Sequence, residues 1–164
     1  MDTVRSWMSS PAIVAPETML LPEARQLLHD RQIRRLPVID AMGHLVGIVS
    51  QGDIHRVSDT PDTDVRDYDL RYRVSNLPLA EIMTREVITV TPDTPMIEVA
   101  QLLLEHKIGG TPVVVAGQVT GMITESDLFR MIIMAEEDMS VRHTNRQYSI
   151  LERLPRGFRE RVRL

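Results

Sequence analysis

Residues 47–54 read Gly-Ile-Val-Ser-Gln-Gly-Asp-Ile, and residues 121–128 read Gly-Met-Ile-Thr-Glu-Ser-Asp-Leu. Three further blocks recur in the same order along the chain, namely residues 7–9 with 82–84, 15–18 with 91–94, and 33–39 with 108–114. The offset between the copies stays between 74 and 76 residues, a drift that one-residue changes in loops explain. Because four blocks in one order indicate duplication, the chain contains two copies of one structural unit.

The first helix of each copy is predicted from turn and capping residues. Thr18 and Thr94 are the expected N-caps, since a threonine hydroxyl can accept a hydrogen bond from an unpaired amide of the first turn. Pro95 suits the first helical position, where its missing N–H costs nothing. In the first copy, Pro22 predicts a helix that begins about one turn after Thr18.

The β-rich runs complete the unit. Strands are expected at residues 12–14, 36–40 and 45–49 in the first copy, and at 87–90, 111–115 and 119–123 in the second. A second helix opens at Ser50 or Thr124. The predicted fold class is therefore α/β (α+β), with two pseudo-symmetric β-α-β-β-α repeats packed as one module, because one copy alone could not bury both faces of so small a sheet.

The repeats divide the chain into four expected segments: a first repeat at 1–57, an acidic linker at 58–78, a second repeat at 79–135 and a basic C-terminal extension at 136–164. The charge is uneven. From residue 142 onward, seven arginines against two glutamates give +5, which leaves −9 on the preceding 141 residues out of a net charge of −4. An acidic body is atypical of a dedicated nucleic-acid-binding protein. We expect the extension to dock on its own body or on a partner subunit.

Composition excludes several classes of protein. There are no cysteines among the 164 residues, so disulfides, thiolate metal sites and cysteine nucleophiles are excluded. The five histidines show no metal-ligand spacing, and no phosphate-binding glycine loop or serine nucleophile motif is present. The N-terminus lacks a secretory signal pattern, and no apolar stretch reaches the length of a membrane span. We expect a cytoplasmic protein that is not an enzyme, binds no metal and contacts no membrane.

The paired blocks resemble the CBS domain, named for cystathionine β-synthase, in its tandem form, the Bateman module. The resemblance rests on Ile-x-x-h-Pro-Val and Gly-h-h-Ser/Thr-x-x-Asp-h, where h is apolar, and covers roughly residues 4–57 and 79–135. It implies regulatory binding of adenosine-containing ligands such as AMP, ADP, ATP, S-adenosylmethionine or NAD in clefts between the repeats. It also implies a homodimer, which we expect to use helices of both repeats, including residues 129–135.

The resemblance also implies roles for individual residues. Asp53 and Asp127 would hold a ribose, and Ser50 and Thr124 would contact ribose or phosphate, with Ser126 assisting in the second copy. The chemistry is suitable, because a carboxylate can accept hydrogen bonds from both hydroxyls of a cis diol. The apolar residues expected to enclose adenine are Ile13, Ile33, Ile88 and Ile108.

Each of these motifs has a second, purely structural interpretation. Ser-x-x-Asp and Thr-x-x-Asp are also capping patterns at a helix start, and capping and binding can coexist there. The copies differ at Arg34-Arg35 and Gly109-Gly110. One hypothesis is that the cleft with Asp53 prefers the more anionic ligand and that the glycine-lined cleft is roomier or empty. The alternative is that both arginines are solvated surface charges.

Two hypotheses for function follow. In the first, the chain is a free-standing CBS pair with no obligatory cofactor, since the repeats, linker and extension account for all 164 residues. It would bind an adenine nucleotide or S-adenosylmethionine and signal to an unknown regulated protein in trans. In the second, the clefts are empty and the chain is an adaptor that binds a protein or nucleic acid through its dimer surface or basic extension.

Overall fold

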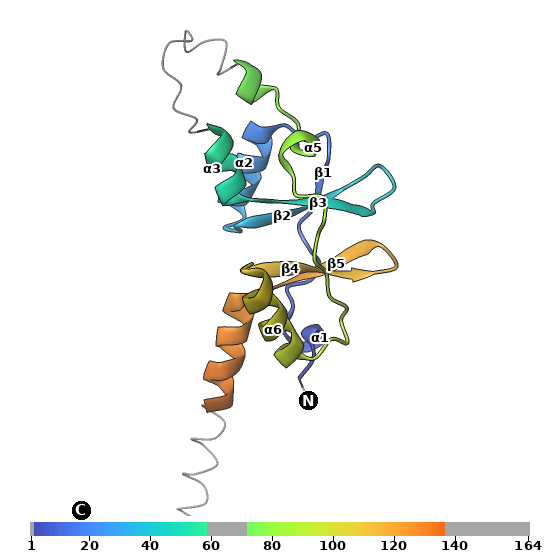
Figure 1. Ribbon diagram of the computed structural model, residues 1–164, viewed down its shortest axis with the longest axis vertical. Coiled ribbons are helices and arrows are strands. Elements are labelled where there is room, and N and C mark those ends of the chain that lie inside the picture. Colours follow the sequence, from blue (N-terminus) through green and yellow to red (C-terminus); the bar gives the residue numbers. More distant parts are fainter. Residues whose placement is uncertain (1, 59–71, 137–164) are drawn as a thin grey trace, which may run out of the picture. The chain divides into compact units, whose positions relative to one another are not determined.

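The computed structural model describes residues 2–58 and 72–136 of the chain, shown as coloured ribbon in Figure 1. The basic extension from residue 137 onward and residues 59–71 of the expected acidic linker lie outside the described residues. The chain divides into two compact units, Met1–Glu125 and Ser126–Leu164. In the described part of the chain, no helix has the length and apolar character needed to cross a membrane.

The first repeat is a three-stranded sheet with helices packed on it (Figure 1). Strand β1 runs parallel to β2, and β2 runs antiparallel to β3. Helix α2 contacts both α3 and β2. The element bounds are β1 Ala15–Pro16, α2 Leu21–Asp30, β2 Arg35–Ile39, β3 Leu45–Ser50 and α3 Gln51–Ser58.

The second repeat follows the same plan. Helix α6, Met96–His106, precedes the antiparallel pair β4, Gly110–Val115, and β5, Gln118–Thr124. A further helix spans 125–136. Val90 forms a parallel bridge with Val113, which repeats the pairing of β1 with β2. The predicted mixed α/β fold with two repeats is confirmed.

The predictions for the leading strands and the first caps were partly wrong. Residues 12–14 are not a strand, and of residues 87–90 only Val90 pairs with a strand. Thr18 does not cap α2, because the helix begins at Leu21 and the Leu20 amide donates to Glu23 Oε2 at 3.1 Å. The late start predicted from Pro22 is confirmed.

Thr94 is also not an N-cap. Its Oγ1 accepts a hydrogen bond from the Thr91 amide at 3.1 Å, so this hydroxyl closes the turn before the helix. Helix α6 begins at Met96, so Pro95 is its N-cap and not its first helical residue as predicted.

Each repeat carries the leading segment of the other. Helix α1, Val4–Trp7, joins the second repeat, where the Val4 amide donates to the Thr94 carbonyl at 2.9 Å. Helix α5, Leu79–Ile82, joins the first repeat, where the Leu79 amide donates to the Met19 carbonyl at 2.9 Å. The chain therefore uses residues 10–14 to cross from the second sheet to the first, which explains why they form no strand.

Backbone pairs anchor both crossings. Ser9 and Met122 exchange hydrogen bonds of 2.9 and 3.0 Å, and Thr84 and Ile48 exchange two of 2.9 Å. These are equivalent positions of the two repeats. The crossings bind the two copies into one unit through backbone hydrogen bonds as well as side-chain packing.

Glycines permit the close approach of these segments. A Cβ atom on Gly121 would lie 2.8 Å from the sulfur of Met8 and 2.9 Å from the Ser9 carbonyl. A Cβ atom on Gly47 would collide with the side chain of Met83. The recurring glycine and the recurring methionine of the two copies are thus a packing pair.

The buried core of each repeat includes residues from the crossing segment of the other. In the first repeat the fully buried side chains include Leu21, Leu36, Val49 and Ile54, together with Leu79 from α5. In the second they include Val99, Val113 and Ile123, and Val4 of α1 is buried as well. Neither core is complete without the other copy.

Candidate ligand-binding site

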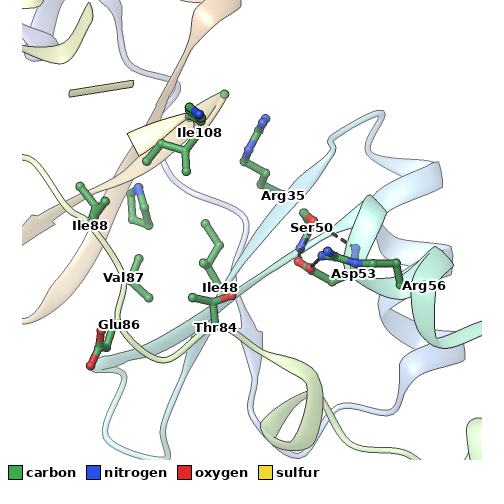
Figure 2. Close-up of a pocket in the computed structure, with 14 residues that line it drawn as sticks. Arg35, Ile48, Ser50, Asp53, Arg56, Thr84, Glu86, Val87, Ile88 and Ile108 are labelled. Atoms are coloured by element: carbon green, nitrogen blue, oxygen red, sulfur yellow. Dashed lines mark hydrogen bonds and ion pairs between the residues drawn. The ribbon is translucent and has the colours of Figure 1, made fainter. Parts of the chain in front are cut away.

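Both repeats contribute to a cavity of about 350 Å³ (Figure 2). Its walls come from three parts of the chain: residues 35 and 48–56 of the first repeat, the crossing segment 84–88, and residues 107–112 of the second repeat. This volume is in the range of pockets that hold small molecules. The crossing of the chain between repeats is what brings these three parts together.

Ser50 and Asp53 lie at the start of α3, on one side of the cavity. The amide and the hydroxyl of Ser50 both donate to Asp53 Oδ2, at 2.7 and 2.6 Å. The Asp53 amide donates back to Ser50 Oγ at 3.2 Å. This reciprocal arrangement is a capping box, so the structural interpretation of the Ser-x-x-Asp motif holds in the first copy.

Asp53 is also paired with a cation. The guanidinium of Arg56, one helical turn along α3, donates to Asp53 Oδ1. Burial raises the pKa of the Asp53 carboxyl, but the hydrogen bonds from Ser50 and Arg56 outweigh it and hold that pKa below its ordinary value. The carboxylate is therefore ionised at neutral pH and available as an acceptor.

Aliphatic side chains form the other side of the cavity. Figure 2 shows Ile88 and Ile108 across the cavity from Ser50 and Asp53. The buried Thr111 hydroxyl donates to the Ile88 carbonyl, which fixes the crossing segment against β4. A wall of branched aliphatic residues can pack against the face of a flat ring.

Arg35 brings a positive charge into the same cavity. Burial lowers the pKa of its guanidinium, the charge of Arg34 lowers it further, and the carboxylate of Glu125 opposes both. Lys107 and Glu86 also line the cavity.

Several residues predicted from the sequence lie together at this cavity. They are Ser50, Asp53, Ile88, Ile108 and Gly109. The structure does not place Ile13, Ile33 or Arg34 in its lining. Arg34 is exposed just before β2, and its neighbour Arg35, the first residue of that strand, lines the cavity instead.

Thr124, Ser126 and Asp127, which the sequence predicted as ligand-binding residues of the second copy, do not line this cavity. Thr124 ends β5, and Ser126 is exposed on the helix 125–136. Asp127 is buried, and the guanidinium of Arg130 donates to its Oδ1 at 3.0 Å. Asp127 and Arg130 repeat the spacing of Asp53 and Arg56, so this ion pair is part of the duplicated unit.

The sequence placed Arg35 beside Asp53 only in the hypothesis of an anionic ligand, and Arg56, Thr84 and Lys107 were not predicted as lining residues. The position of Arg56 near Asp53 could have been predicted, because a residue three positions along a helix lies on the same face. Thr84 belongs to a block that was recognised as repeated but was given no role. Lys107 is the C-cap of α6, with φ of 53°, and it belongs to no sequence motif that indicates a binding role. Over residues 2–58 and 72–136, no cluster of three His, Asp or Glu side chains could hold a metal ion.

Comparison with known proteins supports the duplication of one structural unit in this chain. The model of the CBS domain family matches residues 4–60 and 79–134. The chain is 30% identical over 135 residues to a CBS domain-containing protein of Dictyostelium discoideum, which covers 82% of the chain and 93% of that protein. Other curated relatives are longer, and the match spans 23% of the L-aspartate semialdehyde sulfurtransferase of Methanocaldococcus jannaschii.

Solved structures share the fold. The CBS domain pair of protein MJ0100, in complex with 5′-methylthioadenosine and S-adenosyl-L-methionine, superposes with a TM-score of 0.69 at 31% identity, over 80% of this chain and 96% of that one. The protein CBSX2 in complex with AMP superposes with a TM-score of 0.69 at 27% identity, over 83% of this chain and 99% of that one.

Proposed function

Because the chain belongs to the CBS domain family, we propose that it is a regulatory module that binds an adenosine-containing ligand in the cavity beside Asp53. One observation carries this proposal: an ionised carboxylate, a helix start, an aliphatic wall and a half-buried cation line one cavity built from both repeats. These are the groups that a ribose, a phosphate and a purine require.

Asp53 would accept hydrogen bonds from the ribose hydroxyls. A carboxylate has about four lone-pair positions, of which the two donors of Ser50 and the guanidinium of Arg56 use three. One position remains for a ribose hydroxyl, and accepting from the second hydroxyl would require one of these donors to give way. Ser50 and the first amides of α3 would contact ribose or phosphate, helped by the partial positive charge at the helix start. Ile88 and Ile108 would pack against the adenine ring.

The two related complexes support this class of ligand. One relative binds 5′-methylthioadenosine and S-adenosyl-L-methionine, and another binds AMP. All three compounds contain adenosine. For this chain the proposed ligands are AMP, ADP, ATP, S-adenosylmethionine or NAD.

Regulation would require the ligand to favour one conformation or assembly over another, because a ligand with equal affinity for two states leaves their populations unchanged. The cavity suits this role, because a ligand would contact the first repeat, the crossing segment and the second repeat at once. We propose that the change is passed to a partner protein, and that the module acts as a homodimer.

A helix with an apolar exposed surface supports the dimer. Phe129, Ile132, Ile133 and Met134 on the helix 125–136 are each between 52 and 63% exposed. Their spacing places them on neighbouring parts of the helix surface, and apolar surface of this kind commonly marks an interaction site.

A thermal-unfolding panel tests the ligand. The protein is heated with AMP, ADP, ATP, S-adenosylmethionine, NAD and a GMP control. A ligand at 100 times its Kd stabilises the folded state by about 2.7 kcal/mol, which raises the midpoint by several degrees. We expect the shift for at least one adenosyl compound and none for GMP.

Two matched variants locate the binding. Asp53→Asn should abolish the shift. Asp40→Asn should keep it, because the Asp40 carboxylate also accepts two backbone hydrogen bonds, from Met42 and His44 at 2.8 and 2.9 Å, but lies outside the cavity. A shift that survives in Asp53→Asn would contradict the proposed site. No shift with any adenosyl compound at millimolar concentration, once mass spectrometry had excluded a copurified nucleotide, would favour the adaptor hypothesis.

A further inference from the structure

The Asp53 carboxylate has too few open acceptor positions for both hydroxyls of a ribose. Of roughly four lone-pair positions, two on Oδ2 accept from the amide and the hydroxyl of Ser50, at 2.7 and 2.6 Å, and one on Oδ1 accepts from the guanidinium of Arg56 (Figure 2). One position is left. A cis diol has two O–H donors, so one of the three protein donors has to leave before both hydroxyls can bind.

The two donors of Ser50 belong to the start of α3 and are costly to displace. The amide is part of the backbone where β3 passes into α3. The hydroxyl that donates to Asp53 also accepts from the Asp53 amide at 3.2 Å, so removing it would break the capping box. A ligand that displaced either donor would therefore weaken the helix start.

Arg56 is the donor that can be exchanged. Its side chain is 77% exposed, whereas the side chain of Asp53 is 20% exposed, so the guanidinium stays close to solvent while it pairs with the carboxylate. An exposed ion pair shifts an equilibrium by about fivefold or less, whereas a hydrogen bond to a charged group shifts it by roughly tenfold or more. Exchange of the Arg56 guanidinium for a ribose hydroxyl is therefore the least costly of the three exchanges.

We infer that Arg56 competes with the ribose for Asp53: a ligand with both hydroxyls displaces the guanidinium, and a ligand with one hydroxyl does not. The inference rests on the proposed function and adds the regulation of that same site. Because Asp53 and Arg56 are about one turn apart on α3, a bound riboside opens an ion pair that bridges the turns of this helix. The pair is closed without ligand or with a 2′-deoxyriboside, and it is open with a riboside.

Calorimetric titration with adenosine and 2′-deoxyadenosine measures this competition. The compared quantity is the ratio of the Kd for 2′-deoxyadenosine to the Kd for adenosine, which isolates the second hydroxyl. Both nucleosides are neutral, so a variant that changes the net charge of the cavity affects the two alike. Where the nucleosides bind too weakly to measure, AMP and 2′-deoxy-AMP give the same ratio, because the contributions of their phosphates cancel.

Arg56→Met removes the competing donor and keeps the aliphatic part of the side chain. We expect the Kd for adenosine to fall by about two- to fivefold and the Kd for 2′-deoxyadenosine to stay nearly constant, so that the ratio rises by the same factor. An unchanged or lowered ratio would overturn the inference. A higher Kd for adenosine would do the same, because it would show that Arg56 supports the ligand instead of competing with it.

Arg25→Met is the matched control. The guanidinium of Arg25 in α2 donates to the hydroxyl of Ser58 at the other end of α3, and Arg25 does not line the cavity. This variant removes the same charge and the same donors beside the same helix, so its ratio should equal that of wild type. An equal rise in both variants would overturn the inference. The unfolding midpoint without ligand shows whether each variant keeps its fold.

A salt series on the wild-type protein tests the competition without a substitution. Salt screens an exposed ion pair, so raising the NaCl concentration from about 0.05 to about 0.5 M should weaken the hold of Arg56 on Asp53 and raise the ratio. General effects of salt on the two nucleosides are common to both and cancel. The ratio of Arg56→Met should stay constant over this range. A wild-type ratio that is constant or falls with salt would contradict the competition.

The outcomes separate the inference from the proposed function. If adenosine or AMP binds and the ratio is the same in wild type and in Arg56→Met, the competition is overturned and the adenosyl function stands. If no adenosyl compound binds to either protein, the function fails and the inference falls with it. If the ratio rises in Arg56→Met and not in Arg25→Met, both are supported.

Discussion

Asp53 illustrates how one side chain can serve both structure and ligand binding. Its carboxylate accepts two hydrogen bonds from Ser50 and one from Arg56, and it lies at the cavity. The capping function is a property of the folded chain. The ligand function is the proposal that the same carboxylate, fixed by these donors, presents its remaining lone pair to a ribose hydroxyl.

The capping function predicts a dependence of stability on pH. The folded-state pKa of Asp53 is lowered, so its contribution is present above the unfolded pKa of about 3.9 and is lost as the pH falls through the folded value. We expect Asp53→Ala to lower the free energy of unfolding by about 1 kcal/mol at pH 7. Denaturant unfolding at pH 7 and near pH 2.5 measures this difference, which should shrink at the lower pH. A difference that grows on acidification would contradict the account.

At the residue scale the site was partly predictable. The Ser-x-x-Asp spacing placed Ser50 and Asp53 at a helix start, and the repeat drew attention to Ile88, Ile108 and Gly109. The sequence could not predict whether Arg34 or Arg35 lines the cavity, because this depends on where β2 begins. Leu36, Pro37 and Val38 of that strand are all buried, so no simple alternation of polar and apolar residues marks which neighbour points inward.

At the scale of elements, the exchange of leading segments determines the architecture. The repeated blocks predicted the helices, hairpins and order of each copy, but not which copy each leading segment joins. A segment with equivalent residues in both repeats could contact either sheet through the same local interactions. Sequence symmetry therefore leaves the choice open, and the crossing is decided by the whole chain, including the buried Val4 and Leu79.

The glycine–methionine contacts predict which substitutions break the crossings. Gly121→Ala should lower the free energy of unfolding by about 1–3 kcal/mol, since the added carbon would lie 2.9 Å from the Ser9 carbonyl, a backbone atom that cannot turn away. The control is Gly52→Ala in α3, where the nearest atom is Ser50 Oγ at 3.6 Å and helix propensity favours alanine. Denaturant unfolding of both variants checks this, and equal stabilities would contradict it.

Gly47→Ala offers a rescue test of the other crossing. Its added carbon would collide with the flexible side chain of Met83 and with no backbone atom among its nearest contacts. We expect a destabilisation of about 1–2 kcal/mol that is partly restored when Met83 is also shortened, in the double variant Gly47→Ala with Met83→Val. Strictly additive losses in a double-mutant cycle would show that the two residues do not share this contact.

At the scale of the whole molecule, the proposed dimer predicts a mass and a variant that changes it. We expect light scattering at micromolar concentration to give about twice the chain mass of 18.7 kDa. Ile133→Glu, on the exposed surface of the helix 125–136, should shift the mass toward that of the monomer because burying its charge at an interface is costly. Met42→Glu, at a side chain that is 75% exposed in the hairpin between β2 and β3, should leave the dimer intact. A monomeric wild-type mass would refute the dimer.

A crystal structure of the protein grown with millimolar AMP would show whether an adenosyl ligand binds at the Asp53 cavity. We predict that the ribose hydroxyls lie within about 3.2 Å of the Asp53 carboxylate, with the adenine between Ile88 and Ile108. Density for AMP only at another place on the protein, or an empty cavity under these conditions, would contradict the claim.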